Sequence, residues 1–345
     1  MKALTLAAAG GIGQLKVQEL PEPAIQSPND VLIRVQAAAL NRLDLWVAEG
    51  LPGTNLTFPH IVGSDGAGVV EKVGSGVQRV GVGDRVMINP ALSCGQCSAC
   101  LMGEDSLCAS FRVIGEHRPG TVAEYIVVPE QNLAAVPPSM PWPQAAAFSL
   151  ATLTAWRMLV TRARLRAEET VLIWGIGGGV ALAALQIAKL LGARAIVTSG
   201  SDAKLDAARA LGADVVLNHG KADIRTAVRQ HTGGHGADVV VDSVGEQSWE
   251  GSLRALRRGG RLVICGATTG PMVSIDLRRL FWHQWSILGS TLGTRQEYAE
   301  IVRHAAEGRL WPVIDRVVPL DKALDAFERL QDGAQAGKLV IEVAQ

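Results

Sequence analysis

The stretch that decides the fold is Val171-Leu-Ile-Trp-Gly-Ile-Gly-Gly-Gly-Val-Ala181, which continues as an apolar segment to Ala188. Its start is apolar and typical of a strand, glycines fill its middle, and its end is rich in Ala and Leu, as in a buried helix. The uncharged segment reaches the roughly 18 residues that a membrane-spanning helix needs. Because glycines interrupt it, we predict instead a buried strand, a tight turn and a buried helix.

The glycine turn has the pattern of a phosphate-binding loop. Glycines let the backbone approach a pyrophosphate, and the first turn of the following helix offers free N–H groups and the positive end of the helix dipole. The final position of the G-x-G-x-x-G pattern is Ala181, which the dinucleotide-binding fingerprint allows. We predict that the pyrophosphate of a dinucleotide binds at Gly175, Gly178, Gly179, Val180 and Ala181.

From about residue 165 the chain alternates between strand-like and helix-like segments. The predicted helices Val180–Leu191 and Asp202–Leu211 each end at a glycine, which is the preferred residue after a helix C-terminus. Six strands separated by helices predict an α/β fold with a doubly wound parallel sheet, a Rossmann cofactor domain over residues 151–290. The predicted strands are Thr170–Trp174, Ala195–Ser199, Val215–Leu217, Val239–Asp242, Leu262–Cys265 and Ser286–Leu288.

The end of the second predicted strand bears on the choice of cofactor. An NAD site usually has an acidic residue there for the ribose hydroxyls, whereas this strand ends Ser199-Gly200-Ser201 with Lys204 shortly after. Small hydroxyls and a cation suit a 2′-phosphate, so we predict NADP(H). The alternative is that Ser201 only caps the next helix, that Lys204 is a solvated helix residue, and that Asp202 binds the ribose.

The remaining composition favours a two-domain protein that acts on small molecules. A chain of 345 residues is long for one core, and residues 1–150 read mainly as short strands. Lys plus Arg and Asp plus Glu both number 33, so the chain lacks the basic excess of a nucleic-acid-binding protein. Polar residues soon follow the short apolar start Met1–Ala9, which argues against a signal peptide. We therefore expect a cytoplasmic protein with no nucleic-acid or membrane partner.

Four of the five cysteines form a compact group, which is spaced C-x2-C-x2-C-x7-C. Four thiolates at short spacing suit a closed tetrahedral zinc site, which is structural because no coordination position stays open. On spacing alone, an iron–sulfur cluster is the alternative. The predicted zinc ligands are Cys94, Cys97, Cys100 and Cys108, in a lobe over about residues 93–110, and Cys265 is predicted to be an inert buried thiol.

Over its whole length the chain resembles the medium-chain dehydrogenase/reductase superfamily. The resemblance implies a GroES-like substrate domain from residues 1–150 and 291–345, beside the Rossmann domain, and it supports structural zinc at the four cysteines. It rests on the cysteine lobe, the cofactor turn, and the segments Met1-Lys-Ala-Leu4, Gly63-Ser-Asp-Gly-Ala-Gly68, Val69-Val-Glu-Lys-Val-Gly74, Gly83-Asp-Arg-Val86, Ala123-Glu-Tyr125 and Leu153-Thr-Ala155.

Alcohol dehydrogenases of this superfamily also hold a catalytic zinc through Cys, His and Cys. The matching positions here are Asn41, Ser64 and Leu150, and the proton-relay positions hold Leu43 and Trp46. Neutral amide, hydroxyl and alkyl side chains are poor zinc ligands. The pattern instead resembles the quinone oxidoreductase and enone reductase branch, in which NADPH reduces a quinone or an α,β-unsaturated carbonyl without catalytic zinc.

The resemblance assigns further roles. We predict that the Asn41 amide donates to the substrate carbonyl or to the cofactor, although Asn41 could equally serve only as a local backbone cap. Thr154 matches a position near the nicotinamide, Arg42 one that reaches the pyrophosphate, and His219 a Tyr beside the 2′-phosphate. The strand ends at Val244 and at Gly266-Ala267-Thr268 should border the nicotinamide.

Two other functions stay open at this stage. One is an alcohol dehydrogenase with an unusual second metal site near Asp44, Asp65, His60 or His117. The other is a cofactor-binding protein without turnover. The superfamily also implies a homodimer, or a dimer of dimers, formed through the edge strand near Ser286–Gly293.

Overall fold

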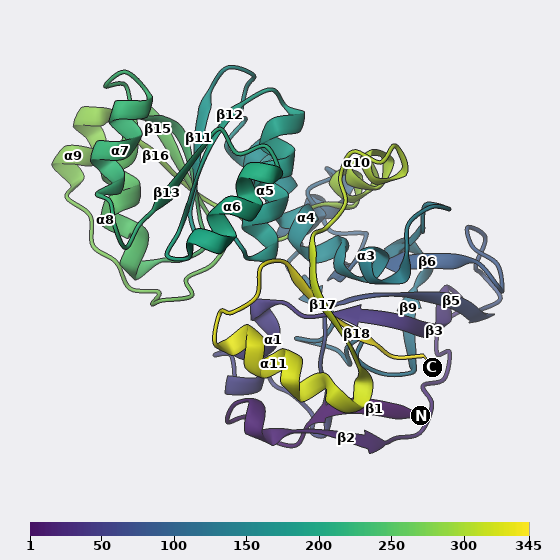
Figure 1. Cartoon of the computed structure of the whole chain (residues 1–345). Coiled ribbons are helices and arrows are strands. Elements are labelled where there is room, and N and C mark those ends of the chain that lie inside the picture. Colours follow the sequence, from purple (N-terminus) through teal and green to yellow (C-terminus); the bar gives the residue numbers. More distant parts are fainter. Residues whose placement is uncertain (345) are drawn as a thin grey trace. The chain divides into compact units, whose positions relative to one another are not determined.

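The computed structural model describes residues 1–344 and divides the chain into two compact units. The first contains Met1–Ala151 and Thr294–Gln345, and the second contains Thr152–Gly293. The helix α4 (Ser149–Trp156) holds the first crossing between the units, and it runs into a π-helical turn, η4 (Arg157–Arg162). Figure 1 shows the elements of both units.

Sheets with mainly antiparallel pairing form the framework of the first unit. A three-stranded sheet has the order β2 (Leu15–Glu19), β1 (Lys2–Leu6), β4 (His60–Ile61). A seven-stranded sheet has the order β10 (Leu133–Ala135), β6 (Arg85–Ile88), β5 (Asp65–Val73), β3 (Asp30–Ala39), β18 (Lys338–Glu342), β17 (Ile314–Pro319), and β9 (Tyr125–Pro129) also pairs with β3. The other strands and helices are β7 (Ala91–Leu92), β8 (Arg112–Val113), α1 (Arg42–Glu49), α2 (Ser98–Leu101), α3 (Trp142–Ala147), α10 (Arg295–Ala306) and α11 (Ala323–Gln331), with short 3-10 turns at Ile12–Gln14, Asp105–Leu107, Glu130–Asn132 and Leu320–Lys322.

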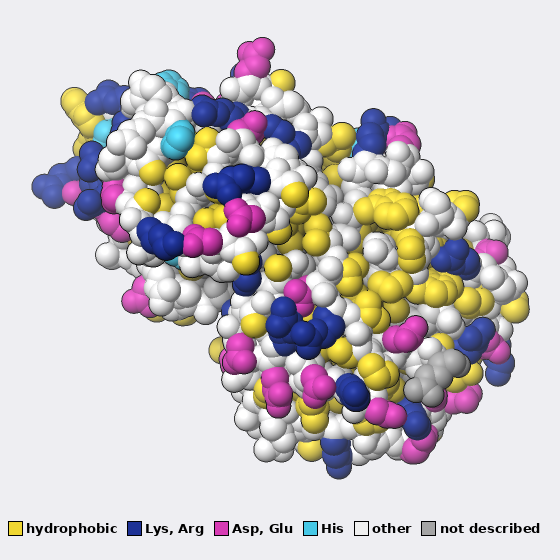
Figure 2. Space-filling model, in the orientation of Figure 1, with side chains coloured by type: hydrophobic (Ala, Val, Ile, Leu, Met, Phe, Trp, Pro, Cys, Tyr) yellow, Lys and Arg dark blue, Asp and Glu magenta, His cyan; other side chains and the backbone are white. Residues whose placement is uncertain are grey.

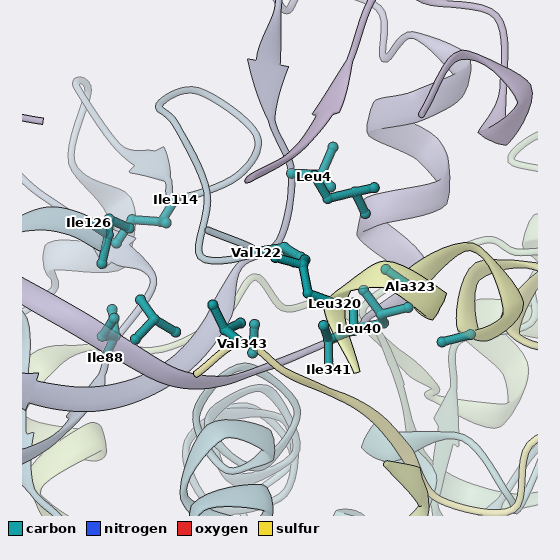
Figure 3. Close-up of a cluster of buried hydrophobic side chains, with 14 of the residues drawn as sticks. Leu4, Leu40, Ile88, Ile114, Val122, Ile126, Leu320, Ala323, Ile341 and Val343 are labelled. Atoms are coloured by element: carbon teal, nitrogen blue, oxygen red, sulfur yellow. The ribbon is translucent and has the colours of Figure 1, made fainter. Parts of the chain in front are cut away.

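The core of the first unit joins the two ends of the sequence. Figure 3 shows Leu4 from β1, Val122 from the middle of the chain and Ile341 from β18 among the side chains of one buried cluster. Strand β18 pairs antiparallel with β3, with Val340 opposite Ala39. This register brings the residues that begin β18 beside those that follow β3.

The second unit is a six-stranded parallel sheet. Its strand order is β13 (Val215–Asn218), β12 (Arg194–Ser199), β11 (Thr170–Ile173), β14 (Ala237–Asp242), β15 (Leu256–Ile264), β16 (Ser286–Gly289). Figure 1 shows α5 (Gly179–Leu190) and α6 (Asp202–Ala210) on one side of the sheet, and α7 (Ile224–His231), α8 (Glu246–Ala255) and α9 (Leu277–His283) on the other. This is the doubly wound order, so the predicted fold class is confirmed.

The structure shifts some predicted boundaries. The segment Val171–Ala188 divides into β11, a turn and α5, and within residues 1–344 every helix is too short or too polar to cross a bilayer. Strand β15 begins at Leu256, whereas the prediction began at Leu262. Gly259 and Gly260, a residue type that is also common in loops, lie in a bulge, where the register with β14 jumps from Leu256 to Arg261.

Charges are mixed on the surface. On the face drawn in Figure 2, Lys and Arg side chains lie interspersed with Asp and Glu, and they form no continuous basic stripe. This distribution agrees with the zero formal net charge of the sequence.

Candidate functional site

The four cysteines converge on one point in the lobe between β7 and β8. Their sulfur atoms all lie within 4.8 Å of one another, with Cys97 Sγ 3.5 Å and Cys94 Sγ 3.9 Å from Cys100 Sγ. Four Zn–S bonds of about 2.3 Å in a tetrahedron place sulfurs about 3.8 Å apart. Gly95 and Gly103 have φ angles of 75° and 78°, which allow the tight turns between the ligands. The arrangement fits one zinc ion.

Backbone N–H groups favour the thiolate form in this lobe. Cys97 N donates to Cys94 Sγ at 3.4 Å, and both Cys94 N and Ser110 N donate to Cys108 Sγ at 3.4 Å. The N–H groups of Gln96 and Cys97 lower the pKa of Cys94 to about 6. Thiolate is the form that binds a metal, so these contacts favour zinc binding at Cys94, whereas burial raises the pKa of Cys100 to about 11. Burial raises the pKa of Cys265 to about 12, as expected for an unreactive thiol.

The glycine turn after β11 has the geometry of an anion site. Gly175 and Gly177 have φ angles of 69° and 121°, and Gly178 caps α5. The first backbone bond of the helix runs from Leu182 N to Gly178 O, so the N–H groups of Gly179, Val180 and Ala181 lie in its first, uncommitted turn. The turn therefore fits the diphosphate of a nicotinamide dinucleotide.

Residues at the C-terminal end of β12 contact the glycine turn that follows β11. Thr198 Oγ1 accepts from Gly175 N at 3.4 Å and lies 3.4 Å from His219 Nδ1, while the His219 ring is 5.8 Å from the Trp174 ring. Burial lowers the pKa of His219. The sequence prediction named His219 but missed Thr198 and Trp174, which neighbouring parallel strands bring to the same sheet edge.

The hydroxyl-rich segment after β12 is ordered by local contacts. Ser199 Oγ accepts from Ser201 N at 3.1 Å, and a Cβ added at Gly200 would lie 3.3 Å from His219 Nε2. Asp202 is bound by Lys221 Nζ at 2.5 Å and by Asn218 Nδ2 at 2.6 Å. The Asp202 carboxylate is therefore already engaged by two donors. Lys204 lies in the first turn of α6.

The loops after β14 and β15 are joined to each other. Val244 O accepts from Thr269 N and Thr269 Oγ1, both at 2.8 Å, and Thr268 N donates to Ser243 O at 3.3 Å. The structure thus brings Val244 next to the loop that holds Gly266, Ala267 and Thr268. The buried Asp242 carboxylate fixes the first loop by accepting from Val244 N, Gly245 N, Ser248 Oγ and Ser252 Oγ, contacts that the sequence prediction missed.

A buried polar cluster lies where the alcohol dehydrogenase pattern would place a catalytic metal. Asp65 Oδ2 accepts from Asn41 Nδ2 and from Lys338 Nζ, each at 3.0 Å, and Lys338 Nζ also donates to Asn41 Oδ1 at 2.5 Å. Asp65 Oδ1 accepts from Leu150 N at 2.7 Å. Lys338 is only 4% exposed and Asp65 is fully buried. The sequence prediction missed Lys338, which reaches the cluster through the pairing of β18 with β3.

Asp44 belongs to the same cluster, and the pKa of its carboxyl is strongly raised. Its Oδ2 accepts from Asn41 N at 2.6 Å at the start of α1. Burial raises the pKa of Asp44 to about 7, against the backbone N–H of Asn41 and the charge of Lys338, which lower it. At neutral pH this carboxyl is therefore shared between its protonated and ionised forms.

Other predicted residues have different surroundings. Arg42 Nη1 donates to Leu330 O at 3.2 Å, and Thr154 is buried in α4. His60 Nε2 lies 2.9 Å from Gly115 O, and His117 Nδ1 accepts from Val113 N at 3.2 Å. Both histidines are thus held by the backbone of one loop. Within residues 1–344, the four-cysteine group alone brings three or more Cys, His, Asp or Glu ligands together closely enough for a metal ion.

We expect one zinc ion per chain, and we expect a variant that lacks one of the four cysteine ligands to lose it. Replacing Cys100 by Ser removes a nearly buried sulfur ligand and should lower zinc content from about one to below about 0.2 per chain. Elemental analysis of the purified protein measures this. Cys265→Ser is the matched control and should keep its zinc. A wild-type chain with two zinc ions would contradict the assignment of a single site.

The titration of Asp44 should make the free energy of unfolding fall as the pH rises from about 4 to about 7. Because its folded-state pKa of about 7 exceeds the ordinary value of 3.8, the folded chain binds more protons in this window, and its free energy of unfolding decreases across it. Asp44→Asn keeps an acceptor for Asn41 N but removes the titration. Relative to wild type, the variant should gain up to about 4 kcal/mol between pH 4 and pH 7 and nothing further above.

Urea unfolding at a series of pH values measures this difference. Asp315→Asn is the control of opposite sign, because the hydrogen bond from Arg329 lowers the pKa of Asp315. Its carboxylate stabilises the fold above the ordinary pKa and loses that contribution as the pH falls, so this variant should lose stability relative to wild type as the pH rises. A pH-independent difference for Asp44→Asn would refute the raised pKa.

Comparisons with known proteins agree with this fold and with the cysteine cluster. Residues 27–138 match the family described as alcohol dehydrogenase GroES-like domain, and residues 179–307 match zinc-binding dehydrogenase. An alcohol dehydrogenase of Geobacillus stearothermophilus is 34% identical over 95% of this chain and 96% of its own length. A quinone oxidoreductase of Rattus norvegicus is 30% identical over 99% and 97%.

Solved structures show the same relationship. A crystal structure of an NAD-dependent alcohol dehydrogenase superposes with a TM-score of 0.96, at 45% identity and with both chains fully covered. These relatives, together with the cysteine cluster, support a structural zinc and a nicotinamide cofactor. The chain is an oxidoreductase that belongs to the medium-chain dehydrogenase/reductase superfamily.

Proposed function

We propose that this protein is an NADPH-dependent reductase of quinones or α,β-unsaturated carbonyls, with zinc only in the cysteine lobe. The observation that carries the proposal is the cluster of Asn41, Asp65 and Lys338. An ammonium group lies there, bound to the amide and carboxylate oxygens that a metal would need. The quinone oxidoreductase relative supports the same branch.

The cluster disfavours a second metal on both geometry and charge. Both oxygens of Asp65 already accept hydrogen bonds, and Asn41 Oδ1 accepts from Lys338. A divalent ion would have to displace a buried ammonium or share its cavity, and either costs several kcal/mol. Alcohol oxidation normally relies on such a metal to acidify the hydroxyl, whereas reduction of a conjugated carbonyl does not.

When bound, the cofactor supplies a hydride to the electrophilic carbon of the acceptor, and a proton from water completes the hydroquinone or the saturated carbonyl. The chain has to orient the acceptor and stabilise the charge that grows on its carbonyl oxygen. We assign the second role to the Asn41 amide. The glycine turn after β11 holds the pyrophosphate, and Val244 and Ala267 border the nicotinamide.

Two features of the β12 end support NADPH over NADH. The acid nearest to the strand, Asp202, is engaged by Lys221 and Asn218. Ser199 and Ser201 offer small hydroxyls, and Lys204 offers a positive charge in the same segment. The 2′-phosphate of the cofactor would raise the pKa of the nearby His219, against the effect of burial.

We also propose a homodimer formed through β16. This strand ends the six-stranded sheet, so one of its edges is available for pairing. Ile287 of this strand is 37% exposed, and Trp282 and Phe281 of α9, which precedes it in the chain, are 65% and 67% exposed. Pairing about a two-fold axis would cover them, and two such dimers could associate further.

Purified wild-type protein with one zinc per chain should oxidise NADPH when a quinone or enone is added. The loss of absorbance of the reduced cofactor across a panel of quinones, enones, aldehydes and alcohols measures this. Rates with conjugated acceptors should exceed those with simple aldehydes by at least about 10-fold, because no metal polarises an isolated carbonyl. Alcohol oxidation that needs a second zinc would refute the proposal, and so would a lack of turnover with every acceptor.

Lys204 should determine the cofactor preference. Lys204→Ala removes a charge from the proposed 2′-phosphate site and should weaken NADPH binding by about 10-fold, while NADH binding changes by less than about 2-fold. Fluorescence titration with each cofactor measures both dissociation constants. Lys189→Ala is the control, since Lys189 pairs with Asp214 at the far end of α5. Equal weakening for both cofactors would count against the assigned 2′-phosphate site.

A further inference from the structure

We propose that Lys338 is a positioning residue, whose ammonium fixes the Asn41 amide in one orientation. The inference deepens the proposed function, because Asn41 is taken to donate to the acceptor carbonyl. It concerns a residue that the sequence patterns did not single out.

The partners of Asn41 determine which way its amide faces. Lys338 Nζ has only hydrogens to offer, so the atom 2.5 Å from it must be the Asn41 oxygen. Asp65 Oδ2 already accepts from Lys338 Nζ, so the Asn41 atom 3.0 Å from it must be the amide nitrogen. A flipped amide would place N–H against ammonium and oxygen against carboxylate, which is two repulsions in place of two bonds. Lys338 and Asp65 together therefore exclude the flipped state.

The backbone around the cluster holds these side chains in place. Lys338 N donates to Val313 O at 2.8 Å, and Leu40 N donates to Leu339 O at 2.9 Å. Asn41 N donates to Asp44 Oδ2 at 2.6 Å. Both residues are thus fixed by their own main chain as well as by their side chains. Such preorganisation is what stabilisation of a developing charge requires.

The cluster also offers a hydrogen-bond donor to a substrate. An ammonium has three hydrogens and an amide nitrogen has two. Within residues 1–344, Lys338 uses two of its hydrogens to donate to Asn41 and Asp65. Asn41 uses one of its hydrogens to donate to Asp65. The Asn41 amide therefore keeps one N–H for a further acceptor. The chemistry that fits is an oxygen gaining negative charge, as in the enolate or hydroquinone anion of the proposed reaction.

A double-mutant cycle tests the positioning role. Lys338→Met and Asn41→Ala should each lower kcat by about 10- to 100-fold, while the dissociation constant for NADPH stays within about 3-fold of wild type. The double variant should be no more than about 3-fold worse than Asn41→Ala alone, because Lys338 acts through Asn41. Lys338→Arg keeps the charge and should recover most of the rate lost in Lys338→Met.

The matched control is Lys189→Met, which breaks a surface pair with Asp214 and should leave kcat unchanged. A merely structural role for Lys338 would lower the thermal midpoint and the yield of active protein but leave kcat per active site intact. Losses that multiply in the double variant, or a more than 10-fold rise in the NADPH dissociation constant, would overturn the inference. The second result would mean that Lys338 binds the cofactor directly.

Two further arms keep the test decisive. If Lys338→Met does not fold, Lys338→Gln, which also removes the charge, replaces it in the same cycle, and non-additivity with Asn41→Ala is still expected. The cycle is run with whichever substrate the wild-type protein turns over, so alcohol oxidation would refute the proposed function while Lys338 is still tested. If no substrate is found, crystal structures of the wild type and of Lys338→Met replace the cycle: the Asn41 side chain should move in the variant, and an unchanged Asn41 side chain would overturn the inference.

Discussion

The ion pair between Lys338 and Asp65 is the constraint around which the substrate-domain site is built. Lys338 is 4% exposed and Asp65 is fully buried, and 273 residues separate them in the sequence. A buried pair of this kind contributes little net stability, but breaking it by removing one partner typically costs about 3–5 kcal/mol. The pair therefore commits the C-terminal strand β18 to its place beside β3. The same contact sets the orientation of Asn41, the proposed donor to the substrate.

Much of the fold could be predicted because its signals are local. The glycine turn from Gly175 lies directly between a strand and a helix, and the four cysteines lie within 15 residues of one another. Lys338 could not be predicted, because its role depends on the register of β18 against β3, which no neighbouring residue reveals. The same holds for Thr198, whose contacts with Gly175 and His219 come from neighbouring parallel strands joined by whole helices. The start of β15 could not be predicted either, because a bulge and a loop use the same residue type, as at Gly259 and Gly260.

The cluster of Asn41, Asp65 and Lys338 explains how the site can do without the ligands of a catalytic zinc. Asn41, Ser64 and Leu150 replace the Cys, His and Cys of a catalytic zinc site, but the loss of ligands alone would leave a buried carboxylate without a counter-charge. Lys338 meets that requirement through its bond to Asp65. Leu150 still takes part through its backbone, because its N–H donates to Asp65 Oδ1. In the proposed function, the carboxylate is thus kept and a side chain of the same protein supplies its counter-charge.

A charge count explains the unusual state of Asp44. The cluster contains two carboxyl groups and one ammonium, and the ammonium contacts Asp65 directly. Asp44 is left with backbone donors and a more distant positive charge, which do not offset its burial, and its pKa rises to about 7. A divalent ion would supply charge for both carboxyls and would favour ionised Asp44. The raised pKa of Asp44, caused mainly by burial, therefore agrees with the proposal that Lys338 is the cation of this site.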